Sequence, residues 1–171
     1  ADTAPQANVG PISTRPDSLD SQPPTNPPAS MDRSLFSADP IPLLSPQEKQ
    51  TQLQSLCEQV RGCRLCPELV ANRTQTVFGT GDPQTRLCFF GEAPGADEDR
   101  QGEPFVGRAG QLLNKIIEAC TLQRQDVYIL NVLKCRPPQN RTPTADEADH
   151  CRSFYERQLE IIRPDYICCL G

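Results

Sequence analysis

The chain has 171 residues, with 17 lysines and arginines against 22 aspartates and glutamates, and its formal net charge is −5. This length allows about one domain of ordinary size. The charge excludes a strongly basic nucleic-acid-binding protein, so any contact with DNA would depend on local patches. Neither a signal peptide nor a membrane-spanning helix is predicted, because the sequence has no apolar run of about 18 residues.

Residues 1–44 differ in composition from the rest of the chain. Ten of the 18 prolines fall in residues 1–46, among Ser, Gln and Asp and with few apolar residues. Such a segment cannot bury enough apolar surface to offset the loss of chain entropy. We therefore predict a disordered Pro/Ser-rich tail over residues 1–44 and one folded domain over residues 45–171.

Three helices are predicted from their caps and from the spacing of their apolar residues. The first begins after Ser45, where Ser-Pro-Gln-Glu forms a capping box with proline at the first helical position, and it ends near Gly62. The second covers residues 108–120, which place their apolar side chains on one face. The third begins after a second capping box at Thr144 and ends at about Ile162.

Continuous apolar runs predict three strands, at residues 86–90, 126–133 and 166–170. The alternation of such strands with amphipathic helices is typical of a parallel sheet covered on both faces. The predicted fold class is therefore α/β, with a parallel sheet flanked by helices in three layers. The sequence stops at Gly171, where the next ligand loop would begin, so we expect the natural protein to continue and this domain to be incomplete at its C-terminus.

Residues 91–113, GEAPGADEDRQGEPFVGRAGQLL, form the strongest candidate for a ligand site. The segment has too many glycines and charges for a core. Glycines let backbone N–H groups approach a ligand, and the start of the following helix adds a positive dipole. The segment also leaves the carboxyl end of a predicted strand, which is where open α/β sheets bind ligands.

Four of the nine cysteines are candidates for a metal site. Cys63 and Cys66 form a CxxC pair just past the end of the first helix, Cys135 follows the second strand, and Cys151 lies in the third helix. The gap between Cys66 and Cys135 is too long for a zinc ribbon. By ligand count alone, four thiolates without histidine fit zinc and a [4Fe–4S] cluster equally well.

The remaining cysteines are interpreted differently. We expect them to be small buried hydrophobic residues, and the lone His150 to be a solvated helix residue rather than a ligand. An odd number of cysteines, two of them adjacent in an apolar run, suits a reducing cytosol better than a disulfide framework. The five cysteines of this group are Cys57, Cys88, Cys120, Cys168 and Cys169.

Three features together resemble the family 4 uracil-DNA glycosylases, the iron–sulfur members of the uracil-DNA glycosylase superfamily. They are the segment 91–113, the segment YILNVLKCRPPQNR with its Asn131, and the four cysteines. The resemblance covers about residues 50–171. It implies a four-stranded parallel sheet between helices, a structural [4Fe–4S] cluster, and hydrolysis of the N-glycosidic bond of uracil in DNA during base-excision repair.

The resemblance also assigns site residues. It matches Glu92, Ala93 and Glu98 to the first catalytic motif, Phe105 to the aromatic that stacks on uracil, and Asn131 to the residue that binds the uracil edge. It matches the cluster ligands to Cys63, Cys66, Cys135 and Cys151. The family's second catalytic motif, a histidine-containing loop after the fourth strand, would lie beyond Gly171, so the fragment itself is expected to be impaired.

The chemistry suggests a role for each assigned side chain. The Asn131 amide carries a donor and an acceptor, which suit uracil O4 and N3–H, whereas cytosine presents the opposite pattern. Glu98 is the first candidate for positioning the attacking water and stabilising the cationic sugar, and Glu92 is the second. Arg108 and Lys134 are candidates for contacts with DNA phosphates.

Neighbouring families and other classes of function give the alternatives. Family 5 enzymes lack the carboxylates found here as Glu98-Asp99, and a covalent uracil-DNA-binding relative carries a basic loop with histidine where residues 134–144 here have none. A module that holds uracil without excising it, or a purely structural or electron-carrying metal protein, stays open. The expected partner is uracil-containing DNA, single- or double-stranded, without a membrane; the expected state is a cytoplasmic, nucleoid-associated monomer.

Overall fold

The computed structural model describes residues 43–170, so the predicted tail lies almost entirely outside the described residues. The elements follow in the order α1 (Pro46–Gly62), α2 (Pro67–Asn72), β1 (Thr80–Gly81), β2 (Leu87–Gly91), α3 (Ala96–Gln101), α4 (Arg108–Ala119), β3 (Tyr128–Asn131), α5 (Ala145–Ile162) and β4 (Tyr166–Cys169). Short 3-10 turns, η2 (Arg124–Asp126) and η3 (Pro138–Asn140), precede and follow β3.

The sheet is mixed, with the strand order β1-β3-β2-β4. β2 pairs in parallel with both β3 and β4, as the sequence predicts, and β1 pairs antiparallel with β3. The register places Gly91 opposite Asn131, which are the last residues of β2 and β3. The carboxyl ends of these two strands therefore lie side by side at one edge of the sheet.

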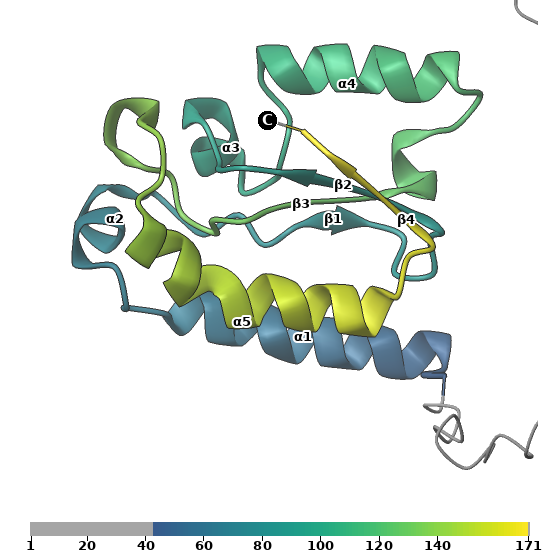
Figure 1. Ribbon diagram of the computed structural model, residues 1–171, viewed down its shortest axis with the longest axis horizontal. Helices are drawn as coiled ribbons and strands as arrows, with labels where there is room; N and C mark the ends of the chain where they lie inside the picture. Colours follow the sequence, from purple (N-terminus) through teal and green to yellow (C-terminus); the bar gives the residue numbers. More distant parts are fainter. Residues whose placement is uncertain (1–42, 171) are drawn as a thin grey trace, which may run out of the picture. The chain divides into compact units, whose positions relative to one another are not determined.

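Helices cover both faces of the sheet, which confirms the three-layer α/β/α prediction (Figure 1). Side chains from α1 and α5 pack with Cys88, Tyr128 and Leu130 on one face. Leu113 and Ile117 of α4 pack with alternate strand residues on the other face. This alternation is the two-residue period of a strand buried on both sides.

Both predicted capping boxes are present. At α1, Ser45 Oγ accepts from Glu48 N–H, and Glu48 Oε2 accepts from Ser45 N–H at 2.7 Å. At α5, Thr144 and Glu147 make the same reciprocal pair. Each box satisfies two backbone donors that the first turn of a helix leaves without partners, so the starts of both long helices were correctly predicted.

The structure adds three short elements that the sequence analysis did not predict, namely α2, α3 and β1. β1 has only two residues, which is too short for an alternating pattern to reveal. Gly81 makes its pairing possible: its φ is 130°, and a Cβ there would collide with the carbonyl oxygen of Val127. Only glycine tolerates both conditions.

Three of the five cysteines expected in the core are exposed instead. Cys88 is buried and Cys57 is half-buried, but Cys120, Cys168 and Cys169 are exposed. Cys120 ends α4, and the other two lie on β4, an outer strand of the sheet whose side chains are all exposed among the described residues. An apolar run alone does not distinguish an outer strand from a central one. Among residues 43–170, no helix is long and apolar enough to cross a membrane.

Candidate functional site

The candidate site lies at the carboxyl ends of β2 and β3, where Gly91 and Asn131 face each other in register. A Cβ built on Gly91 would collide with Asn131 Oδ1 and would lie 2.6 Å from Phe105 Cζ. Gly91 is thus in contact range of both side chains that were predicted to bind uracil. The structure brings Asn131 and Phe105 together at a glycine, whose lack of a Cβ lets both side chains approach its Cα closely.

The Asn131 side chain is buried, with 1% of its surface exposed. Neither Oδ1 nor Nδ2 hydrogen-bonds another group among the described residues. A buried polar atom without a partner costs about 1–3 kcal/mol, and native structures tolerate few of them. A buried amide with both ends unpaired is therefore the strongest structural sign of a polar ligand among the described residues.

Contacts with neighbouring residues hold the backbone of Phe105 in an unusual conformation. Its φ is 53°, in the left-handed region that non-glycine residues rarely adopt. Gly110 of α4 lies directly under it, since a Cβ there would collide with the Phe105 carbonyl oxygen. Arg124 donates to the carbonyl of the preceding Pro104 and to Asn114 Oδ1 at 2.9 Å. A strained conformation that surrounding contacts enforce is typical of a functional site.

The Glu98 carboxylate fixes the same segment from the other side. Its Oε1 accepts from the N–H groups of Val106 at 2.9 Å and Gly107 at 2.8 Å, and its Oε2 accepts from Gly95 N–H at 3.1 Å. The side chain thus joins the start of α3 to the start of α4 across the loop that carries Phe105. Such charge-assisted bonds are stronger than bonds between neutral groups.

This geometry bears on the roles predicted for the two glutamates. Three backbone donors bind the Glu98 carboxylate and hold the Phe105 loop, and Oε2 accepts only one of them, so the prediction that Glu98 positions the attacking water stays a prediction. Glu92, the second candidate, is exposed and directly follows β2. Asp99, next to Glu98, is buried, and both of its carboxylate oxygens accept from Thr74 N–H.

The two predicted phosphate contacts have different outcomes. Arg108 is exposed at the start of α4, where a phosphate can reach it. The prediction for Lys134 is wrong, because this side chain is 1% exposed and its Nζ donates to the carbonyls of Asn131 at 2.8 Å and Phe78 at 3.3 Å. Burial lowers the pKa of Lys134 to about 7, against the opposing effect of nearby cysteines. A lysine is almost never buried in this way, which is why sequence reasoning placed it at the surface.

The four predicted metal ligands come from three separate segments and line one small cavity. Its walls are Val60, Cys63, Cys66, Val70, Arg73, Lys134, Cys135, His150, Cys151 and Phe154. Cys135 and Cys151 are buried here with Leu69 and Leu133, and Ala93 packs against this cluster. In residues 43–170, however, no three His, Cys, Asp or Glu side chains stand in an arrangement that could hold a metal ion. The structure thus gathers the four thiols without setting a coordination geometry.

Three polar contacts at this cavity were not predicted, two from Arg73 and one from His150. Arg73 Nη1 donates to Cys135 Sγ at 2.8 Å, and its Nη2 donates to the Cys63 carbonyl at 3.0 Å. His150, interpreted as solvated, is exposed but has its Nδ1 3.3 Å from Cys66 Sγ. Burial, followed by repulsion from the other cysteines, raises the pKa of the Cys66 thiol to about 11. Only the fold brings these residues together, so sequence spacing gave no signal of them.

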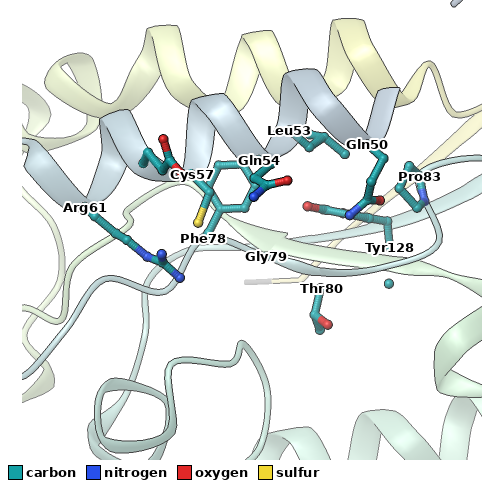
Figure 2. Close-up of a pocket in the computed structure, with 12 residues that line it drawn as sticks. Gln50, Leu53, Gln54, Cys57, Arg61, Phe78, Gly79, Thr80, Pro83 and Tyr128 are labelled. Atoms are coloured by element: carbon teal, nitrogen blue, oxygen red, sulfur yellow. The ribbon is translucent and has the colours of Figure 1, made fainter. Parts of the chain in front are cut away.

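A second hollow lies between α1 and the segment around β1, and it contains none of the predicted site residues (Figure 2). Its walls include Gln50, Gln54 and Arg61 of α1, with Phe78, Gly79 and Tyr128 opposite. None of the residues that line this hollow has a buried side-chain polar atom without a partner; the nearby Gln158 lacks one at Oε1 only, because its Nε2 donates to the Phe78 carbonyl. The ends of β2 and β3 therefore remain the candidate site.

Comparisons with known proteins identify the family of the chain. A family model described as the uracil DNA glycosylase superfamily matches residues 78–171. A type-4 uracil-DNA glycosylase from Thermotoga maritima is 49% identical over 123 residues, which are 72% of this chain and 64% of that protein. One from Archaeoglobus fulgidus is 50% identical over 119 residues, 70% of this chain and 59% of that protein.

A type-5 uracil-DNA glycosylase from Thermus thermophilus is less similar, at 30% identity over 139 residues, covering 64% of this chain and 63% of that protein. The chain thus spans about three fifths of the length of the curated relatives it matches. The family model covers both strand ends of the site, and the type-4 relatives share about half of the matched residues. The chain belongs to the uracil DNA glycosylase superfamily, and within it to the type-4 branch.

Proposed function

We propose that the site at the ends of β2 and β3 binds uracil flipped out of DNA, and that the chain forms the base-recognition part of a uracil-DNA glycosylase. The observation that carries this proposal is the buried Asn131 amide, whose two polar atoms have no partner among the described residues. The similarity to type-4 uracil-DNA glycosylases supports the same conclusion.

Uracil fits the polar groups of this site. Asn131 Oδ1 can accept from uracil N3–H while its Nδ2 donates to O4, which satisfies both unpaired atoms at once. Cytosine offers an unprotonated N3 and an amino group there, so the same amide would meet acceptor with acceptor and donor with donor. Leaving buried groups mispaired costs about 1–3 kcal/mol each, which favours uracil strongly.

The walls of the site suit a flat base that has left the duplex. Phe105 supplies an aromatic face, and stacking on such a face contributes about 1–3 kcal/mol per base. Gly91 has no side chain, so the Asn131 and Phe105 side chains can both lie against its backbone. The Ala93 side chain packs against the cysteine cavity, so its backbone N–H is the group that Ala93 can offer to uracil O2.

The reaction would be hydrolysis of the bond between C1′ of the sugar and N1 of uracil. A water oxygen bonds to C1′, uracil leaves with the electron pair of the broken bond, and the water proton is released. Positive charge develops on the sugar, so a carboxylate near C1′ stabilises it and can orient the water. Glu92 is exposed at the end of β2 and takes this role, whereas Glu98 holds the Phe105 loop in place.

The four cysteines would hold a [4Fe–4S] cluster. The fit rests on the donor set, because all four line a single cavity that contains no carboxylate. A bound cluster would supply cross-links between the α1–α2 connection, the end of β3 and α5, which makes its role structural. The Arg73 guanidinium, which donates to Cys135 Sγ, would stabilise a thiolate ligand at that position.

The proposal is tested by incubating the full-length, cluster-loaded protein with single-stranded oligonucleotides that carry one uracil, thymine or cytosine. We expect alkali-labile cleavage at uracil only. A gel-mobility shift with the uracil oligonucleotide, without cleavage, would favour the alternative function, a uracil-binding module that does not excise. Absence of both cleavage and uracil-dependent binding in folded protein would contradict the proposal.

A further inference from the structure

Lys134 is the one buried lysine among the described residues, and it lies between the two candidate sites. Its Nζ donates to the Asn131 carbonyl at 2.8 Å, three residues back along the chain, and to the Phe78 carbonyl at 3.3 Å. Its side chain also forms part of the wall of the cavity that holds Cys63, Cys66, Cys135 and Cys151. One side chain therefore contacts the residue that carries the base-binding amide and borders all four cysteines.

Hydrogen bonds hold the backbone at the end of β3, and the bond from Lys134 is one of them. β3 ends at Asn131, and the next backbone bonds join Val132 and Leu133 to the carbonyls of Gly91 and Glu92. The Asn131 carbonyl itself is held by the Lys134 ammonium. Because the side-chain amide and this carbonyl project from the same Cα, a displacement of the Asn131 backbone carries the amide with it, and the Lys134 bond opposes such a displacement.

We propose that Lys134 is a positioning residue for Asn131, and that it links the packing of the cysteine cavity to base recognition. The inference rests on the proposed function, and it gives a chemical role to a buried lysine that cannot reach a phosphate. Any change in the cavity wall moves Lys134, because Cys135 directly follows it, and any movement of its Nζ releases the Asn131 carbonyl.

A second lysine provides a matched control. Lys49 Nζ also donates to two backbone carbonyls, those of Ile162 at 2.7 Å and Pro83 at 3.1 Å. It lies in α1, and it borders neither the cysteine cavity nor Asn131. Lys49→Met thus removes the same number of ammonium–carbonyl bonds from a partly buried site with no proposed role in binding.

The test compares Lys134→Gln, Lys134→Met, Lys49→Met and Asn131→Ala in full-length, cluster-loaded protein. Affinity is measured for an oligonucleotide whose single deoxyuridine carries a 2′-fluorine, which resists cleavage because fluorine destabilises the cationic sugar. The second readout is the visible absorption of the cluster near ~400 nm. Wild-type protein is the reference for the proposed function, since failure of wild-type protein to prefer uracil over thymine contradicts that function and not the role of Lys134.

We expect Lys134→Met to weaken uracil-dependent binding at least tenfold and to alter or reduce the visible absorption. Lys134→Gln keeps one donor for the Asn131 carbonyl, so its loss of affinity is smaller. Asn131→Ala changes affinity alone, and Lys49→Met changes neither readout. If Lys134→Met fails to fold, Lys134→Gln decides. Wild-type affinity together with an unchanged cluster spectrum, in Lys134→Met where that variant folds and otherwise in Lys134→Gln, would overturn the inference.

Discussion

At the scale of single residues, the candidate site is defined by the two unpaired atoms of the Asn131 amide and by Gly91, which both Asn131 and Phe105 approach closely. Asn131 and Phe105 could be chosen from the sequence because each is out of place, an amide inside an apolar strand and an aromatic in a glycine-rich loop. Lys134 could not, because nothing in the sequence reveals that two backbone carbonyls receive its charged end inside the domain. The sequence thus singles out side chains that contradict their neighbours, and the roles of Asn131 and Phe105 in binding stay predictions.

Replacing Gly91 with alanine tests whether the space beside Asn131 is the ligand site. The new Cβ would lie 2.6 Å from Phe105 Cζ and would collide with Asn131 Oδ1, so both proposed base-binding side chains would have to shift. We expect at least tenfold weaker binding of a uracil-containing oligonucleotide, which is about 1.4 kcal/mol or more. Gly62→Ala is the control, because a Cβ at Gly62 meets no atom within 4 Å. Equal affinity in the two variants would place the base elsewhere.

Asn131→Asp tests how the base is distinguished. A carboxylate cannot donate to uracil O4, and it places a negative charge beside that oxygen. We expect the preference for uracil over cytosine to fall by one to two orders of magnitude, in line with about 1–3 kcal/mol for a mispaired buried group. The measurement is the ratio of binding or cleavage for matched oligonucleotides. An unchanged ratio in a folded variant would remove Asn131 from the recognition site.

At the scale of elements, the long helices and three strands were predictable because each has a local signal. The capping boxes at Ser45 and Thr144 mark helix starts within four residues of sequence. The sequence predicts the loop between α3 and α4 as a ligand loop, but it does not reveal the hydrogen bonds that hold this loop in place. Glu98 and Arg124 hold that loop through backbone groups at Gly95, Pro104, Val106 and Gly107, and such contacts form only after α3, α4 and η2 are in place.

Glu98→Gln separates a positioning role from a direct chemical one. A glutamine keeps one acceptor oxygen for Val106 and Gly107 but presents an NH2 group to Gly95 N–H, so one of the three bonds is lost. We expect a loss of about 1–3 kcal/mol in unfolding free energy and weaker uracil binding. Asp97→Asn, which removes an exposed ion pair with Arg100, should change little. A fall in turnover with stability and affinity intact would instead make Glu98 a catalytic residue.

The start of α5 gives the domain a defined sensitivity to acid. The Arg141 guanidinium bonds both Glu147 oxygens, at 2.9 and 2.7 Å, and lowers the pKa of that carboxyl from 4.5 to about 2; Thr144 N–H contributes to the same effect. A carboxyl whose folded-state pKa is depressed stabilises the fold above its unfolded pKa, and this contribution is lost as the pH falls toward the folded value. The affected window is therefore about pH 4.5 to 2.

We expect Glu147→Gln to be less stable than wild type at neutral pH and the difference to shrink as the pH falls from about 4.5 to 2. Urea unfolding at a series of pH values measures this. Glu156→Gln is the control on the same helix, because Glu156 forms only an exposed pair with Arg152 at 4.0 Å. A stability difference between wild type and Glu147→Gln that is constant across the window would show that the ion pair does not stabilise the start of α5.

At the scale of the whole molecule, the same sheet carries the candidate base-binding site and leads to the cysteine cavity. The end of β2 leads to the Phe105 loop, and the end of β3 leads through Asn131 and Lys134 to Cys135. The α/β class and three layers could be predicted because buried strands and amphipathic helices alternate along the chain. The exposure of β4 could not, because it depends on which strands lie next to it in the sheet.

The cysteine cavity joins parts of the chain that are far apart in sequence, so its loss should affect the whole fold. We expect Cys135→Ala to lose visible absorption near ~400 nm and to lower the melting temperature, because ligand binding and folding are coupled. Cys120→Ala removes an exposed cysteine outside the cavity and should leave both unchanged. Native stability and absorption in Cys135→Ala would show that Cys135 is not a ligand. If the wild-type protein binds zinc in place of iron, it will be stable but colourless.

The most direct test of the central claim is the side-chain amide signal of Asn131 in nitrogen-15 NMR, assigned by comparison with Asn131→Asp. The signal is followed while single-stranded oligonucleotides carrying uracil, with a 2′-fluorine to block cleavage, or thymine are added. We predict a large shift with the uracil oligonucleotide and little change with thymine, because a base at this site pairs with both unpaired atoms of the amide. An Asn131 signal that stays in place while the protein binds uracil-containing DNA would contradict the account.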